Sequence, residues 1–110
     1  MPATEIAPHS EVLDRDQLAP LYNVVLLDDN VHTYDYVIEM LQHLFLLPES
    51  EAFRHAVEVD TTGRTVVLTC DLPAAEFARD QIKGYGPDWR MPESKCSMAA
   101  IVEPAAGDCR

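Results

Sequence analysis

The sequence predicts an α+β fold in which a small antiparallel sheet of about three strands packs with three helices. Two aliphatic runs, residues 22–27 and 65–70, are typical of buried strands. Apolar residues recur at helical spacing between these runs and after them, and prolines and glycines stand where the pattern changes. The elements follow in the order β-α-α-β-α-β, and 110 residues are enough for one such domain.

The first strand is expected at residues 22–27 and ends at the turn-favouring residues 28–30. Thr33 can then cap a helix, because its hydroxyl can accept a hydrogen bond from the first turn. The apolar stripe of this helix comprises Tyr36, Val37, Met40, Leu41, Leu44 and Phe45.

Pro48 breaks the first helix and can open a second one. The expected inner face of the second helix consists of Ala52, Phe53, Ala56, Val57 and Val59. Gly63 ends the loop that follows, and residues 65–70 form the second strand. His43 and His55 fall outside the apolar stripes, so both are expected at the solvated surface.

Pro73 stands where a third helix would begin. The inner face of this helix is expected to hold Phe77, Ala78, Ile82 and Tyr85. Residues 86–95 form an irregular loop, from which Trp89 is expected to anchor into the core. Residues 97–102 are the candidate for the last strand.

Composition and charge exclude several classes of function. The formal net charge is −11, which argues against nucleic acid and anionic membranes and favours cationic partners. No apolar run is long enough to span a bilayer, and no signal peptide is expected at the start. The cysteines Cys70, Cys96 and Cys109 lack the spacing of a zinc site or a disulfide framework. We therefore expect a cytoplasmic protein.

The main candidate site is the run of Asp28, Asp29 and Asn30, followed by His32. Three adjacent acceptors in a strand-to-helix loop can converge on one cation, and an ammonium group offers three donors. The same residues could instead form an Asx-type turn and a helix cap.

Two further kinds of chemistry find less support in the residues. Asp28, Asp29, His32 and Asp60 could ligate a metal, but their spacing matches no EF-hand or H-E-x-x-H motif. Neighbouring Asp28 and Asp29 would point to opposite faces of an extended chain, which separates the two carboxylates. No nucleophile elbow or phosphate loop is present. A binding module without metal or cofactor is therefore expected, rather than an enzyme.

Residues 22–38, YNVVLLDDNVHTYDYVI, resemble the opening of ClpS, the adaptor of the Clp protease system. In that family a strand Y-x-V-x-L leads to N-D-D and then to a helix. Residues 56–64, AVEVDTTGR, resemble the V-H-x-x-G-K/R turn of the same family. The resemblance covers residues 21–103, which leaves residues 1–20 as a flexible tail and residues 104–110 as a frayed end.

The resemblance implies that the chain binds the free first residue of other polypeptides. The α-amine would be held by Asp28, Asn30 and Asp60, with Asp29 supporting the loop. The pocket for a bulky hydrophobic first side chain would be formed by His32, Tyr34, Val37, Ala56, Val59 and Met98. Asp60 stands where the family has His, and Tyr34 and Ala56 stand where it has Met.

The resemblance also implies the partners. A ClpS-type adaptor passes its substrates to an AAA+ unfoldase of the ClpA or ClpC class, and a monomer is expected. The replacement of the family's His by Asp60 leaves open a domain that docks an unfoldase without reading N-termini.

Overall fold

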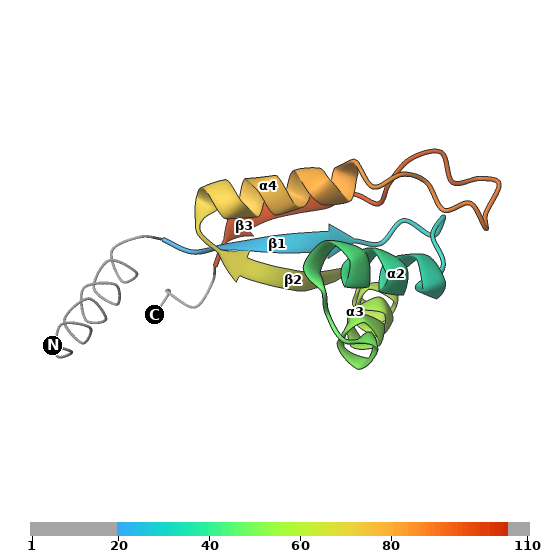
Figure 1. The fold of residues 1–110 in the computed structure, drawn as a ribbon, viewed down its shortest axis with the longest axis horizontal. Coiled ribbons are helices and arrows are strands. Elements are labelled where there is room, and N and C mark those ends of the chain that lie inside the picture. The colour runs from blue at the N-terminus through green and yellow to red at the C-terminus, as the bar shows by residue number, and fades with distance from the viewer. Residues whose placement is uncertain (1–19, 106–110) are drawn as a thin grey trace, which may run out of the picture.

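The structure is a computed structural model that describes residues 20–105. Its elements are β1 (Tyr22–Leu27), α2 (Tyr34–Phe45), α3 (Glu49–Thr62), β2 (Arg64–Cys70), α4 (Leu72–Lys83) and β3 (Ala100–Pro104) (Figure 1). This order confirms the predicted α+β fold. The expected tail lies outside the described residues except for Pro20, as do residues 106–110 of the expected C-terminal end. Pro104 closes β3.

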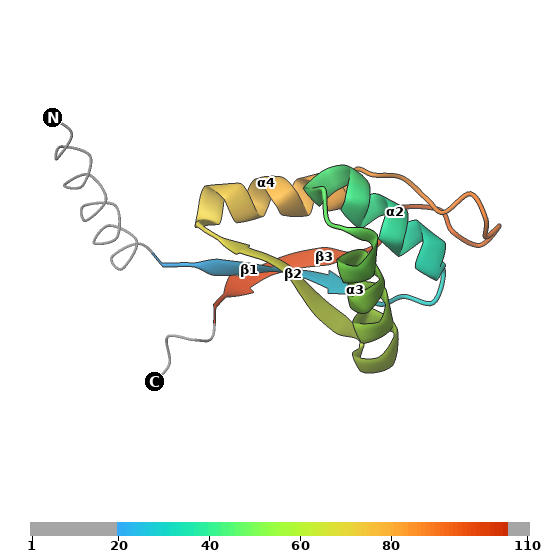
Figure 2. The ribbon, with the colours of Figure 1, turned by 60° about the horizontal axis from the view of Figure 1, so that its bottom comes forward.

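The sheet has the order β2-β1-β3, and both outer strands run antiparallel to β1 (Figure 2). Val24, Val25 and Leu26 of the central strand are fully buried, as expected for an aliphatic run flanked on both edges. The register of β1 with β2 shifts between Val24 and Val25 and then places Leu27 opposite Arg64. The end of β1 therefore lies beside the turn that enters β2.

The helices lie in two places relative to this sheet. Helix α4 runs along one face, whereas α2 and α3 pack together where β1 ends and β2 begins (Figure 1). Helix α2 starts at Thr33, whose side chain accepts from Tyr36 N at 3.1 Å, and α4 starts at Asp71, which accepts from Ala74 N at 3.1 Å. Helix α3 stops at Gly63, where φ is 91°. No helix within residues 20–105 is long and apolar enough to cross a membrane.

The core confirms the predicted stripe of α2 but corrects the inner faces of α3 and α4. Ala52, Ala56 and Val59 are buried on α3, whereas Phe53 is 50% exposed. Ala75, Ala78 and Ile82 are buried on α4, whereas Phe77 is 65% exposed. Each phenylalanine is adjacent in sequence to a buried alanine, and one residue turns a helix by about 100°. The small alanines therefore face inward and the large rings face outward.

Three other expectations were wrong. His55 is 5% exposed rather than solvated, because its ring hydrogen-bonds Thr65 of β2 at 2.8 Å. Trp89 is 81% exposed rather than anchored in the core, because its neighbour Asp88 points inward. The last strand begins at Ala100, since Ser97 instead bonds back to Gly86 within the loop.

Candidate functional site

The candidate site lies where the loop after β1 meets the end of α3. The backbone N–H of Asp28 donates to Gly63 O at 3.1 Å, which fixes the loop against the turn after α3. Asp60 lies on the last turn of α3, one turn before that glycine. Asp28 and Asp60, distant in sequence, are therefore brought to the same corner of the fold.

Within this loop, Asp29 has a supporting role. Its Oδ1 accepts from Val31 N at 3.1 Å and bonds His32 Nδ1 at 2.8 Å, so an Asx-type turn is indeed present. Asn30 adopts a left-handed conformation with φ of 68° and is exposed. The side chains of Asp28 and Asn30 make no hydrogen bond to any residue within 20–105, which leaves their oxygens available to a ligand.

His32, expected beside the pocket, lies between two loops. Its Nδ1 faces the Asp29 carboxylate at 2.8 Å, and its Nε2 faces Cys96 O at 2.8 Å. The side chain is 1% exposed and its ring centre lies 4.5 Å from that of Tyr36. His32 therefore ties the loop after β1 to the long loop between α4 and β3.

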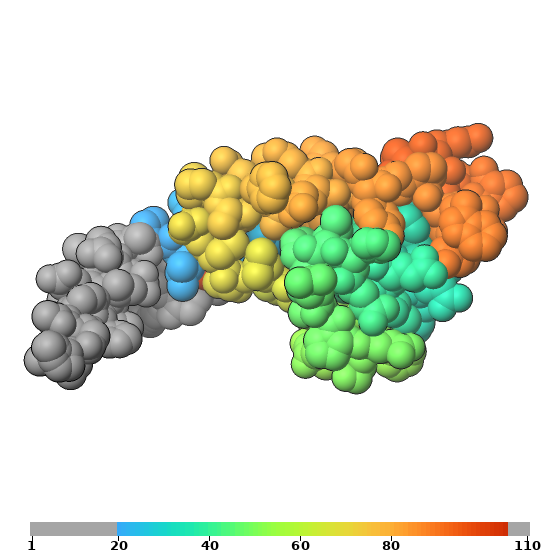
Figure 3. All heavy atoms as spheres, in the orientation of Figure 1, coloured from blue at the N-terminus to red at the C-terminus, as the bar shows by residue number. Residues whose placement is uncertain are grey.

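Asp88 forms a second connection between the same two loops. Its Oδ2 accepts from Thr33 N at 2.7 Å and from Thr33 Oγ1 at 2.8 Å, while its Oδ1 accepts from Arg90 N and Arg90 Nη1. Burial alone would raise the pKa of Asp88, but these bonds outweigh it and lower the pKa to about 2. The long loop packs against the start of α2 (Figure 3). The sequence offered no signal for this contact, because both partners lie in irregular segments.

The expected pocket residues are covered in this structure, with one exception. Val37, Ala56, Val59 and Met98 all belong to the buried hydrophobic core of the fold, and each is at most 3% exposed. Tyr34, at the start of α2, is 37% exposed. The four core side chains are therefore closed to a ligand in this structure.

Tyr34 is held from two sides. Its hydroxyl donates to Asp60 Oδ2 at 2.8 Å, and its ring meets Phe53 edge-on with ring centres 6.0 Å apart. The bond to Asp60, then burial, then the charges of Asp60 and Asp28 raise the pKa of Tyr34. Tyr34 therefore lies within electrostatic reach of both candidate carboxylates.

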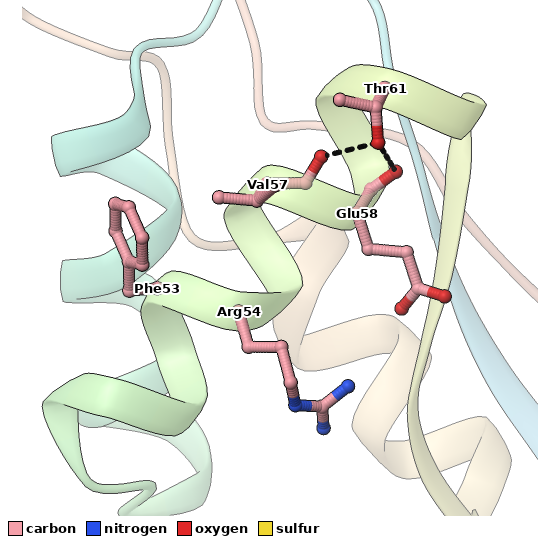
Figure 4. Close-up of a pocket in the computed structure, with 5 residues that line it drawn as sticks. All are labelled: Phe53, Arg54, Val57, Glu58 and Thr61. Carbon is pink, nitrogen blue, oxygen red and sulfur yellow. Dashed lines mark hydrogen bonds between the residues drawn. The ribbon is translucent and has the colours of Figure 1, made fainter.

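The outer face of α3 carries a groove that the sequence analysis missed. It has a volume of about 480 Å³ and is lined by Phe53, Arg54, Val57, Glu58 and Thr61 (Figure 4). The Thr61 hydroxyl donates to Val57 O at 2.9 Å, which turns it toward its own helix. The spacing of Phe53, Val57 and Thr61 along one helical face was the available signal.

The proposed metal ligands do not gather into a metal site. Across residues 20–105, no group of three or more His, Cys, Asp and Glu side chains is placed to hold an ion. Asp29 and His32 bond each other, and Asp60 accepts from Tyr34. What the geometry offers instead is a set of oxygen acceptors beside a covered apolar cluster.

The chain is similar to known proteins in sequence and in fold. Residues 17–90 match the family ClpS, described as ATP-dependent Clp protease adaptor protein. An ATP-dependent Clp protease adapter protein ClpS of a Synechococcus species is 33% identical over 85 residues, covering 76% of this chain and 93% of the relative. Human E3 ubiquitin-protein ligase UBR1 is 30% identical over 81 residues, which cover 74% of this chain and 4% of that enzyme.

A solved structure shares the fold. It is that of Agrobacterium tumefaciens ClpS2 bound to L-phenylalaninamide, which superimposes with a TM-score of 0.67 at 24% sequence identity. The match covers 78% of this chain and 98% of that protein.

Proposed function

The chain belongs to the ClpS family of adaptors of the ATP-dependent Clp protease, and on this basis we propose that it binds the free first residue of substrate polypeptides. Asp28, Asn30 and Asp60 hold the α-amine, and Asp29 fixes the shape of their loop. The first side chain enters the space above Val37, Ala56, Val59 and Met98, and the substrate is then delivered to an unfoldase.

The observation that carries this proposal is the contact between the loop that holds Asp28 and the turn that follows Asp60. The bond from Asp28 N to Gly63 O places the end of β1 against the turn after Asp60. A free α-amine has an ordinary pKa of about 7.7–8.0 and is mostly charged at neutral pH. Its three donors match acceptors from Asp28, Asn30 and Asp60. Hydrogen bonds to a charged donor are about twice as strong as neutral ones. The amine contacts therefore fix the position of the ligand's first residue in the site.

The apolar cluster supplies the second part of the affinity. Burying an aromatic or leucine side chain removes roughly 150–200 Å² of apolar surface from water, worth about 4–5 kcal/mol. Together with the amine contacts, and against the entropy of association, this suggests a Kd of roughly micromolar. We expect Phe, Tyr, Trp and Leu to be preferred as first residues over β-branched Ile and Val. The small side chain of Ala56 leaves room at the bottom of the proposed pocket, and the bulky Tyr34 narrows its entrance. L-Phenylalaninamide, the ligand of Agrobacterium ClpS2, combines a free amine with such a side chain.

The partner in delivery is a Clp-type AAA+ unfoldase, of the ClpA or ClpC class. The family is one of adaptors, which supports a binding protein rather than an enzyme. We further propose that the chain acts as a cytoplasmic monomer, with neither metal nor cofactor taking part in recognition.

The covered pocket favours a second candidate function. Val37, Ala56 and Val59 are nearly inaccessible, and Asp60 is already engaged by Tyr34. A chain that kept this closed state would dock an unfoldase without reading N-termini. Peptide binding separates the two functions, since only the first requires the site to open.

Two substitutions test the amine site. Asp28→Ala and Asp60→Ala should each weaken binding of a peptide that begins with Phe by at least about tenfold, because each removes a charged acceptor. Asp80→Ala, which removes an exposed acid on α4, is the matched control and should leave affinity unchanged. Circular dichroism melts should show all three variants folded. Unaltered affinity in both site variants would contradict the placement of the amine, and unfolding of either would mean that the acid has a structural role.

A further inference from the structure

Tyr34 links the start of α2 to α3 through its contacts with Asp60 and Phe53. It is the first residue of α2, so its backbone is fixed by the Thr33 cap. Val37 lies one turn further along α2, and Ala56 lies one turn before Asp60 on α3. The bond between Tyr34 and Asp60 therefore joins the two helices one turn away from Val37 and Ala56.

Tyr34 is more exposed than the two core residues next to this contact. Val37 and Ala56 are 3% and 1% exposed, whereas Tyr34 is 37% exposed. Its ring is held by one hydrogen bond of 2.8 Å to Asp60 and by edge contact with Phe53, itself 50% exposed. Rotation of this one side chain would break both contacts and free the Asp60 carboxylate without moving a helix.

We propose that Tyr34 is a lid over the first-residue pocket, latched by Asp60, and that the ligand's amine replaces its hydroxyl on that carboxylate. This inference rests on the proposed function, since it concerns how the same site opens. The exchange is one donor for another: the Tyr34 O–H leaves Asp60 and an ammonium N–H takes its place. The ammonium carries the charge, so it is the stronger donor.

The latch lowers the affinity of every ligand that must open it. A hydrogen bond contributes about 0.5–1.5 kcal/mol net, which corresponds to a factor of roughly 2–12 in Kd. Because this cost is common to all such ligands, the latch lowers their absolute affinities and leaves the preference between first residues unchanged. The ordinary pKa of a tyrosine, about 10, already keeps the Tyr34 hydroxyl protonated and able to donate at neutral pH, and its bond to Asp60 raises that pKa further.

Tyr34→Phe tests the latch, because it keeps the ring and its contact with Phe53 but removes the hydroxyl. A peptide that begins with Phe should bind the variant about three- to tenfold more tightly than wild type, with most of the gain in the association rate. Tyr85→Phe is the matched control, since the Tyr85 hydroxyl makes no hydrogen bond to a residue within 20–105. It should leave the affinity unchanged.

Equal or weaker binding by Tyr34→Phe, with wild type binding normally, would overturn the lid while leaving the proposed function intact. If neither wild type nor Tyr34→Phe binds the peptide, the proposed function fails, and the lid with it. Binding by the variant alone would support the lid strongly. The hydrogen bond between Tyr34 and Asp60 can also be tested without a ligand. Asp60→Ala should lower the pKa of Tyr34, measured by ultraviolet titration. Comparison with Tyr34→Phe identifies the part of the absorbance change that belongs to Tyr34. An unmoved titration would show that the latch is absent.

Discussion

His55 lies on the inner face of α3 and links that helix to the sheet. Its Nδ1 bonds the hydroxyl of Thr65 at 2.8 Å, and Thr65 in turn donates to Glu58 Oε1 at 2.5 Å. The Thr65 hydroxyl has one proton and gives it to Glu58, so it must accept from the ring. Burial, and then the charge of Arg54, lower the pKa of His55. The folded protein therefore favours the neutral ring.

This linkage predicts a loss of stability in mild acid. The pKa of His55 is lower in the folded chain than the ordinary value of about 6.5, so below that pH the unfolded chain binds more protons. The contribution of His55 to stability is present above about pH 6.5 and is lost as the pH falls. Urea unfolding of wild type and His55→Gln from about pH 5 to 7.5 measures it. Their free energies of unfolding should converge toward low pH.

The exposed His43 provides the control for this measurement. His43→Gln should retain the pH dependence of wild type, because its ring lies at the surface of α2. Parallel curves for wild type and His55→Gln would contradict the account of the buried ring. Sequence alone misplaced His55, because the partner that makes its burial tolerable is a threonine on another element.

The long loop between α4 and β3 is bonded to the segment that carries the candidate site. Asp88, 1% exposed, accepts bonds from Thr33 and Arg90, and Arg90 also pairs with Glu39 of α2 at 2.6 Å. The Tyr36 hydroxyl donates to Gly86 O at 2.5 Å. These bonds hold the loop to the start of α2, which is also the end of the candidate amine loop.

Asp88→Asn should therefore affect both stability and binding. The pKa of Asp88 is about 2 instead of its usual 3.8, which corresponds to about 2 kcal/mol of stability at neutral pH. The carboxylate gives this contribution above pH 3.8 and loses it as the pH falls through about 2. Urea unfolding should show a loss of about 2 kcal/mol, and peptide affinity should fall because Thr33 is released.

The exposed Asp80→Asn on α4 is the control for both readouts and should match wild type. An Asp88→Asn variant as stable as wild type would contradict the role of the loop. If Asp88→Asn is less stable but binds the peptide normally, the loop contributes to stability and not to binding.

Helices and strands were predictable here, and the orientation of their larger side chains was less so. Helical spacing located α2, α3 and α4, and the caps at Thr33 and Asp71 agree with local chemistry. Phe53 and Phe77 were assigned to the core because they are apolar. The alanines next to them take the inner positions, since small residues allow the helices to pack closely. Hydrophobicity alone could not distinguish these neighbours.

At the scale of the whole molecule, the topology gathers the candidate site at one end of the sheet. The antiparallel register pairs Tyr22 with Cys70 and with Pro104, so the site lies at the opposite end of β1. The net charge of −11 surrounds it with a negative field that favours a cationic ligand. The sequence predicted the fold, and it named Asp28 and Asp60, whose segments the bond from Asp28 N to Gly63 O brings together. It could not predict that the Tyr34 hydroxyl donates to Asp60, because this contact joins two helices at positions distant in sequence.

The central claim is that the chain reads a free α-amine, and calorimetry tests it most directly. One peptide that begins with Phe is titrated into the protein, alongside the same peptide with its N-terminus acetylated. Acetylation removes the charge and two donors from the group that faces Asp28, Asn30 and Asp60. Our account predicts that affinity falls at least about a hundredfold, or roughly 2.7 kcal/mol. Equal affinity for the two peptides would contradict it.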